Sequence, residues 1–441
     1  MPEDFESRLA EAFDCLSTSR ITDGYSVRLG MEGKLTSLLK EIVREDLGFD
    51  TYEHKLTEQA FANEIQSQLI SISENIGEDD ADRVEEFKSQ KGDFLSDVLG
   101  SEKDTYTVAF PLNIRKSESL PDSFSAPETE FQRLSYEEWE EEHKDPALEA
   151  DETTLEHFLE ESPNKLDARD SLSRFYTFWE TEYEARDADF ALYMVQDIVR
   201  LLIAKLNFVM KKWSIELPQP SGKGSRPPRA QWSWLQEPFL FLLFDEEGYV
   251  DYWPMDYNYR RGPVTTPDDI DDCISEFEQL PDLTAERPAL EGLNESLVNA
   301  LFAYQEGITE SSTTQSFFGF WRGVENLSQV ERQQKSEIIV ERAEFAFEHV
   351  RGENRRPRID EAIDELQSKR NTLAHEGPNT HVSQNHQGAA KLLLDSLLEF
   401  YFEYYPEDFS EEEYQFFLKQ GASSPEDRER TFEILNKFDY D

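Results

Sequence analysis

An arginine and a histidine lie five residues apart in the segment Arg370-Asn-Thr-Leu-Ala-His375. A histidine changes its charge near neutral pH, and the planar fork of an arginine matches the oxygens of a phosphate. Side chains of these two types could therefore act together on a phosphate-containing substrate. The bare spacing is a weak signal, so its meaning depends on the elements that position the two residues.

The segment lies near the end of a predicted helix. The apolar stripe of this helix consists of Ile359, Ile363, Leu366 and Leu373. Arg370 occupies a position in the stripe where an apolar residue is expected, and burying an arginine without a partner is costly. Such a break in the pattern often marks a functional site. Gly377-Pro378 predicts the end of the helix, so His375 falls in the final turn, where the helix dipole favours the protonated imidazole.

The surrounding chain predicts a helical bundle. From about residue 290, apolar residues recur at helical spacing in five stretches, which begin near Leu290, Phe317, Ile338, Ile359 and Ala390. Five amphipathic helices joined by short polar loops indicate a bundle over residues 289–405. Residues 406–441 are predicted to form an acidic helical tail.

The pattern Arg370-Asn371-x-x-x-His375 stands in a long helix, before a helix stop and a further long helix. This constellation resembles the HEPN superfamily, and most of all the Apea-like HEPN proteins of antiviral defence. The resemblance covers roughly residues 290–405. It implies a metal-independent RNA endonuclease without a cofactor, in which a homodimer brings two motifs together across a cleft.

The resemblance also implies roles for individual residues. His375 would be the general acid or base at the ribose 2′-hydroxyl, and Arg370 would hold the scissile phosphate. Asn371 would orient the phosphate or the histidine. Glu325, beside the apolar stripe of an earlier helix, would pair with Arg370 or fix the imidazole.

Two other interpretations remain open at this point. In one, Arg370 and Glu325 form only a buried ion pair and His375 caps a helix end. In the other, the bundle is a non-catalytic HEPN-type module that dimerises or binds RNA or a nucleotide. Residues five apart on a helix point about 140° apart, so a single chain does not align the two side chains. Catalysis requires that both reach solvent in a positive cleft, whereas the module interpretation expects them buried or apart.

Basic residues near the motif could contact an RNA backbone, because phosphate contacts supply most nonspecific affinity. The candidates are Arg351, Arg355, Arg356, Arg358 and Lys369. A solvated loop whose arginines pair with Glu353 and Asp360 is an equally good explanation of the arginine cluster. Lys369 could instead form an exposed i,i+4 salt bridge with Glu365.

We expect no metal site. His375, His381 and His386 lie close together in the sequence, and imidazole suits zinc or manganese, but their spacing matches no strong metal motif. Cys15 and Cys273 are far apart, which argues against a disulfide framework and a zinc site.

Residues 1–288 are predicted to form an α+β region that senses an unknown trigger or restrains the nuclease, so the fold class is mainly α. Its expected elements are helices over 1–98, a strand over 104–114, a helix over 166–212 and a hairpin over 239–253. Residues 218–230 are rich in proline and glycine and locally basic, which suggests a linker and a break between domains. They lack the spacing of a phosphate-binding loop.

The composition is strongly acidic. The 441 residues include 94 Asp and Glu against 44 Lys and Arg, for a net charge of −50, and the acids are spread along the chain. Such a charge repels itself at low salt and is screened in molar salt, so we interpret it as halophilic adaptation. A protein that binds cations or basic partners is the alternative. Without a secretory signal or an uninterrupted apolar span, the chain is expected to be cytoplasmic and to make no membrane contact.

Overall fold

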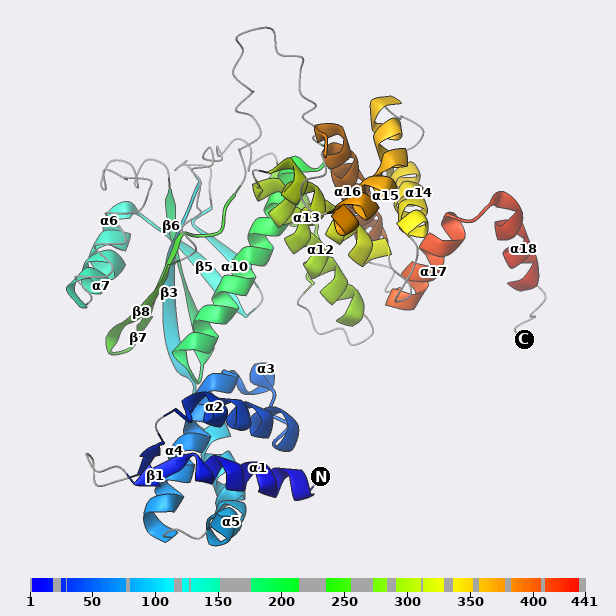
Figure 1. The fold of residues 1–441 in the computed structure, drawn as a ribbon. Coiled ribbons are helices and arrows are strands. Elements are labelled where there is room, and N and C mark those ends of the chain that lie inside the picture. Colours follow the sequence, from blue (N-terminus) through cyan, green and yellow to red (C-terminus); the bar gives the residue numbers. More distant parts are fainter. Residues whose placement is uncertain are drawn as a thin grey trace, which may run out of the picture.

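The chain folds into helices and one central sheet (Figure 1). The computed structural model describes residues 2–18, 25–28, 30–76, 80–114, 121–126, 128–150, 176–213, 235–254, 273–283, 291–310, 312–328, 336–351, 357–376, 382–405 and 409–435. The predicted mainly α class is confirmed, with an α+β region ahead of a helical bundle. None of the described helices is both long and apolar enough to cross a membrane.

The first hundred residues form a helical unit with a core of its own. Its helices are α1 (Pro2–Asp14), α2 (Glu32–Glu41), η1 (Ile42–Asp46), α3 (Thr51–His54), α4 (Glu58–Ile76) and α5 (Asp80–Leu99). A short hairpin, β1 (Leu16–Thr18) and β2 (Tyr25–Val27), joins α1 to α2. Phe13, Phe61 and Phe87 are buried in this core. The predicted helical character is confirmed, except for the hairpin.

An antiparallel sheet of six strands follows, in the order β4-β5-β6-β3-β7-β8. The strands are β3 (Asp104–Leu112), β4 (Ser123–Ala126), β5 (Thr129–Leu134), β6 (Thr177–Ala185), β7 (Leu240–Asp245) and β8 (Gly248–Pro254). The predicted strand at 104–114 and the predicted hairpin at 239–253 are confirmed. Gly248 begins β8 with φ +129, a conformation that other residues rarely adopt.

The prediction of one helix over 166–212 is wrong for Thr177–Ala185, which is strand β6. Trp179 and Tyr183 are buried on one face of β6, and Glu182 and Glu184 are exposed on the other. This period of two is the mark of a strand. Helix α10 (Ala188–Lys211) begins only after β6, and Asp187 caps it by accepting a hydrogen bond from the Phe190 amide (3.0 Å).

Helices cover both faces of the sheet (Figure 1). On one face α10 packs against β3, β6 and β7, with Val195 and Val199 in the shared core. On the other face lie α6 (Tyr136–Trp139), the π-helix η2 (Glu140–Lys144) and α7 (Asp145–Ala150). Trp139 packs there against Phe178 of β6.

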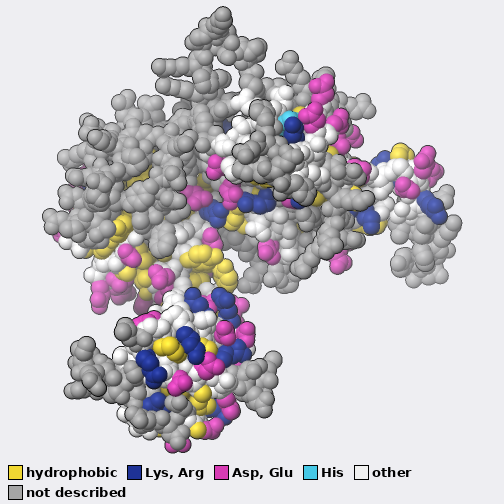
Figure 2. Space-filling model, viewed as in Figure 1, with side chains coloured by type: hydrophobic (Ala, Val, Ile, Leu, Met, Phe, Trp, Pro, Cys, Tyr) yellow, Lys and Arg dark blue, Asp and Glu magenta, His cyan; other side chains and the backbone are white. Residues whose placement is uncertain are grey.

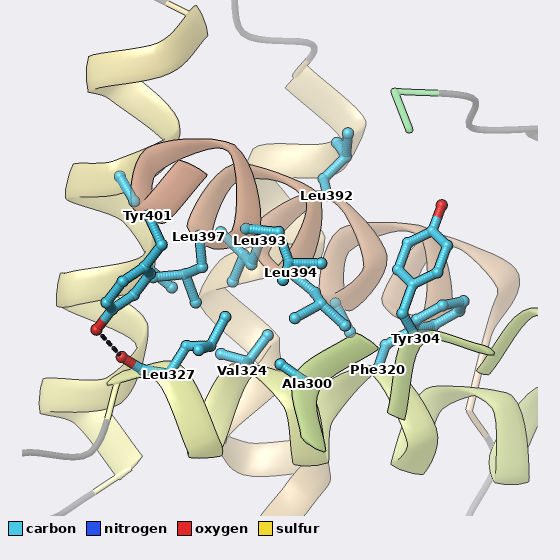
Figure 3. Packing of buried hydrophobic residues seen from close by; sticks show 14 of the residues in the cluster. Ala300, Tyr304, Phe320, Val324, Leu327, Leu392, Leu393, Leu394, Leu397 and Tyr401 are labelled. Atoms are coloured by element: carbon cyan, nitrogen blue, oxygen red, sulfur yellow. Dashed lines mark hydrogen bonds between the residues drawn. The ribbon is translucent and has the colours of Figure 1, made fainter. Parts of the chain in front are cut away.

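The five predicted bundle helices are confirmed. They are α12 (Glu291–Thr309), α13 (Thr313–Ser328), α14 (Ser336–Arg351), α15 (Pro357–Glu376) and α16 (Gln384–Tyr404). Figure 3 shows Val324 and Leu327 facing the leucines of α16, with the Tyr401 hydroxyl donating to the Leu327 carbonyl (2.8 Å). Helices α12 and α13 approach closely, since a Cβ at Gly319 would lie 2.8 Å from the Gly307 Cα.

The predicted tail contains α17 (Glu411–Gly421) and α18 (Pro425–Leu435). Tyr414 and Leu418 of α17 are fully buried in the same core as α12–α16. The first part of the tail is therefore packed as a member of the bundle.

Helix α10 belongs to both the sheet core and the bundle core. Ala204 and Phe208, in its second half, are buried among the bundle helices. At its end, the buried Lys391 of α16 donates to the Lys211 carbonyl (2.7 Å) and to Asp395 (2.9 Å). One helix thus connects the two parts that the sequence analysis separated near residue 288, and the expected break at 218–230 lies outside the described residues.

Candidate functional site

Arg370 and Glu325 meet where α15 packs beside α13. Ile363 and Leu366 bury α15 in the bundle, and Val324 does the same for α13. Arg370 lies one turn beyond Leu366, and its Nε donates to Glu325 Oε1 at 3.0 Å. The sequence indicated a buried arginine, but the Arg370 side chain is 38% exposed and that of Glu325 is 20% exposed. The stripe thus ends at Arg370, at the edge of the core.

The Arg370 guanidinium has hydrogen-bond donors that Glu325 does not use. Among the described residues, Glu325 is its only hydrogen-bond partner, and that bond uses Nε. The two Nη groups thus have no described partner. A pair this exposed contributes about 0–1 kcal/mol to stability, so its main effect is to fix the orientation of the guanidinium.

A cavity of about 490 Å³ opens beside this pair. Its lining consists of Glu306, Thr309, Glu310, Gln315, Phe318, Gly319, Trp321, Arg322, Glu325 and Arg370. Pockets of this size and mixture of aromatic and polar groups are typical of small-molecule sites. Arg322 contacts Glu306, as Arg370 contacts Glu325. Three glutamates against two arginines make the lining close to balanced, rather than the positive cleft that catalysis was expected to require.

Arg200 and Glu237 extend the charge interactions that begin at Glu306 in the cavity lining. Arg200 of α10 lies 3.7 Å from Glu306 and 3.2 Å from Glu237. Burial raises the pKa of the Glu237 carboxyl, although the Arg200 charge acts in the opposite direction. Arg200 also stacks over the Phe302 ring of α12 at 4.2 Å. This network connects the cavity to the helix that packs on the sheet.

The remaining motif residues lie on the same helix. Helix α15 continues through Glu376, so His375 is in its final turn as predicted, but the His375 side chain lies outside the described residues. Asn371 and Lys369 are half-buried. The helix is continuous between the two motif residues, and positions five apart on such a helix lie about 140° apart around its axis.

The structure does not gather the described part of the basic cluster at the cavity. Arg351 ends α14, where its guanidinium stacks over the Trp213 ring at 4.0 Å. Arg358 is in the first turn of α15, but its side chain lies outside the described residues, as do Arg355 and Arg356 altogether. Only Arg351 can thus be located, and it is not part of the cavity lining.

His386 links the start of α16 to α15 through hydrogen bonds. The Ser383 amide donates to its Nδ1 (3.2 Å), so Nε2 carries the proton and donates to Glu365 of α15 (2.8 Å). This bond lowers the pKa of the Glu365 carboxyl. Both ring nitrogens of His386 are therefore hydrogen-bonded, so neither is available as a metal ligand. His381, another histidine of the suggested metal cluster, lies outside the described residues.

Arg322 and Glu306 were not predicted as site residues. Arg322 lies three residues before Glu325, which places the two on one face of α13. The spacing of Arg322 and Glu325 was visible in the sequence. The contact between Arg322 and Glu306 was not, because Glu306 belongs to another helix, α12. The role of His386 could also have been predicted from the sequence, because Ser383 and His386 have the spacing of a helix capping box.

Comparison of the chain with models of protein families, with curated proteins and with solved structures finds no match.

Proposed function

We propose that the C-terminal bundle is a metal-independent RNA endonuclease of the HEPN type. The observation that carries this proposal is the Arg370–Glu325 pair in the lining of the cavity, with Arg370 on the helix that also holds His375. A guanidinium fixed through Nε, with both Nη groups open, is prepared to bind a phosphate through two parallel bonds.

In the proposed reaction, Arg370 holds the scissile phosphate and Glu325 keeps the guanidinium in place. His375 acts as general base on the ribose 2′-hydroxyl, or as general acid on the leaving 5′-oxygen. The 2′-oxygen bonds to phosphorus while the bond to the 5′-oxygen breaks, which leaves a 2′,3′-cyclic phosphate. Asn371 orients the phosphate or the imidazole. No metal-bound water is needed, because the RNA supplies the nucleophile.

We further propose that the site is completed by a homodimer. One chain holds one motif, and positions five apart on a continuous helix lie about 140° apart around its axis, so a second copy must supply the missing group. The RNA would lie between the two copies, in the cytoplasm of a cell with high internal salt. The N-terminal region would respond to a trigger in antiviral defence or stress. Light scattering in molar KCl should detect a dimer, and a strict monomer would contradict this arrangement.

The experiment that tests the function is incubation of the full chain with total RNA in molar KCl and EDTA. Wild type should cleave the RNA. Arg370→Lys should not, because an ammonium does not reproduce the planar fork. Arg428→Lys, at an exposed position on α18, is the matched control and should keep full activity. Equal cleavage by Arg370→Lys and wild type would contradict the role of Arg370.

The alternative function is a non-catalytic module that binds a nucleotide or RNA. The cavity favours it, because a single chain already provides two arginines beside Phe318 and Trp321. This alternative predicts that wild type binds RNA without shortening it, and that Arg370→Lys weakens binding.

A further inference from the structure

A histidine and two glutamates come together far from the bundle, where η2 lies on the sheet. Glu142 and His143 are consecutive residues of η2, and Glu180 lies on β6. One potential ligand atom from each of the three lies within 4.8 Å of the others. The closest pair is His143 Nε2 and Glu180 Oε2, at 2.8 Å.

The imidazole is held in position with one nitrogen uncommitted. The His143 side chain is only 7% exposed, and its ring packs against Phe244 with 5.0 Å between ring centroids. Its Nδ1 is buried without a hydrogen-bond partner among the described residues. The other ring nitrogen, Nε2, faces Glu180 and is the atom that can bind an ion together with the carboxylates.

The local backbone is unusual at the same point. Glu142 and His143 belong to a π-helical turn, a rare conformation that is often found at functional sites. The turn continues α6, whose N-terminus is fixed by the Ser135–Glu138 capping box. The two consecutive side chains thereby reach the same strand residue, Glu180.

An acidic groove leads from solvent to Glu180. A cavity of about 480 Å³ on the sheet is lined by Glu180 together with Glu128, Glu130, Glu182 and Glu184. Lys55 is the single basic residue in this lining. A groove lined by charges of one sign raises the local concentration of counter-ions, so this one attracts cations toward the cluster.

We propose that His143, Glu142 and Glu180 bind one divalent transition-metal ion of the zinc type. Imidazole and carboxylates are suitable ligands for such an ion, at distances of about 2.0–2.2 Å. The ion takes the place of the proton between His143 Nε2 and Glu180 Oε2. That proton moves to Nδ1 or is released to solvent, and the two side chains separate slightly. Water fills the remaining coordination positions. The ion clips η2 to β6 and takes no part in the RNA chemistry proposed for the bundle.

The test is a titration of the EDTA-treated and desalted full chain with zinc chloride in molar KCl, followed by calorimetry. Wild type should bind one Zn²⁺ saturably, and its melting temperature should rise with Zn²⁺ and return with EDTA. Loss of an outer-shell partner already costs about 10–100-fold in affinity, so His143→Gln should weaken binding by more than about 100-fold. Glu142 is exposed, so Glu142→Gln should weaken binding with the fold intact.

Glu182→Gln is the matched control, because Glu182 lies on the same strand and in the same groove but outside the cluster. It should bind Zn²⁺ like wild type. Equal losses in Glu180→Gln and Glu182→Gln would reveal diffuse attraction by the groove and overturn the site. Absence of saturable binding to wild type would do the same, as would binding that His143→Gln and Glu142→Gln leave unchanged.

Discussion

At the scale of single residues, the proposed phosphate binding depends on how Arg370 is held. Its Nε is bonded to Glu325, and a guanidinium fixed at one edge loses little freedom when it binds a phosphate at the other. The same bond explains why a charged residue can follow an apolar stripe. Arg370 lies at the edge of the core, where Glu325 is its partner, rather than inside the core.

Replacing Glu325 with glutamine should separate the functional role from the structural one. We expect Glu325→Gln to lower RNA cleavage at least about tenfold, because the Arg370 guanidinium loses its charged anchor. The free energy of unfolding should change by less than about 1 kcal/mol, since the pair is partly exposed. Glu361→Gln, at an exposed position on α15, should change neither quantity. A Glu325→Gln variant with wild-type cleavage would mean that the pair is structural only.

Spacing within one helix can be read from the sequence, whereas contacts between helices cannot. The contact of Glu325 with Arg370 was expected only because the resemblance implies an acidic residue on an earlier helix and Glu325 lies beside the apolar stripe of α13. The Glu365–His386 bond could not be predicted, because its partners lie on two helices whose packing angle is set by the whole core. In the proposed dimer, whether Arg370 and His375 form an active site depends on the second chain, which no spacing within one chain determines.

At the scale of elements, α15 is held to α16 by the bond between Glu365 and His386. The bond lowers the pKa of Glu365 below its ordinary value, so the stabilisation is present above that value and is lost as the pH falls through the lower folded-state pKa. Glu365→Gln should therefore lower the melting temperature at pH 7. The difference from wild type should begin to shrink as the pH falls below about 4.3, the ordinary pKa of a glutamate, and should disappear only below the lowered folded-state pKa.

Melting curves between pH 3 and pH 8 at constant molar KCl check this expectation. Asp364→Asn, a neutralised acid at the neighbouring exposed position, serves as the control for general charge effects. If the two variants show the same pH dependence, the link between the helices contributes nothing specific.

Helix α16 contains a buried ion pair, Lys391–Asp395, whose lysine also donates to the Lys211 carbonyl of α10. Burial lowers the pKa of the Lys391 ammonium and raises that of the Asp395 carboxyl, so each requires the other to stay charged. Lys391→Met should cost about 3–5 kcal/mol, because it leaves a buried carboxylate unpaired. Urea unfolding in molar KCl measures this cost, and Lys391→Met with Asp395→Leu should recover part of it. A cost below about 1 kcal/mol for the single variant would show that the pair is not needed.

The elements themselves were predictable where the apolar period was long. The five bundle helices and the hairpin β7–β8 followed from the sequence, whereas β6 was taken for helix. Only Arg186 and Asp187 separate strand β6 from α10. The prediction of one helix over 166–212 therefore included both elements. Its strand character depends on pairing with β3 over nine residues, which is a long-range contact.

At the scale of the whole molecule, charge is the dominant property. On the face shown in Figure 2, acidic side chains recur beside lysines and arginines, most clearly over the N-terminal helices. Several bases there are bound to acids, as Arg8 is to Glu45 and Lys88 is to Glu6. The 94 acids nevertheless outnumber the 44 bases by 50, so a large excess of negative charge remains.

The folded state should therefore require salt. At a net charge of −50, self-repulsion destabilises the compact state at low ionic strength, and molar salt shortens the Debye length to about 3 Å. We expect the melting temperature to rise steeply with KCl and the protein to unfold or aggregate on dialysis to low salt. Sucrose at matched water activity serves as the uncharged control. A melting temperature independent of KCl would contradict halophilic adaptation.

The most direct test of the proposed nuclease is cleavage of RNA by His375→Ala in molar KCl and EDTA. Loss of a general acid or base slows chemistry by about 10²–10⁴-fold, while a residue in the last turn of a helix should cost less than about 1 kcal/mol of stability. The account predicts that wild type yields 2′,3′-cyclic phosphate ends and leaves DNA intact, and that a folded His375→Ala yields no cleavage above background. Full RNA cleavage by His375→Ala would contradict it.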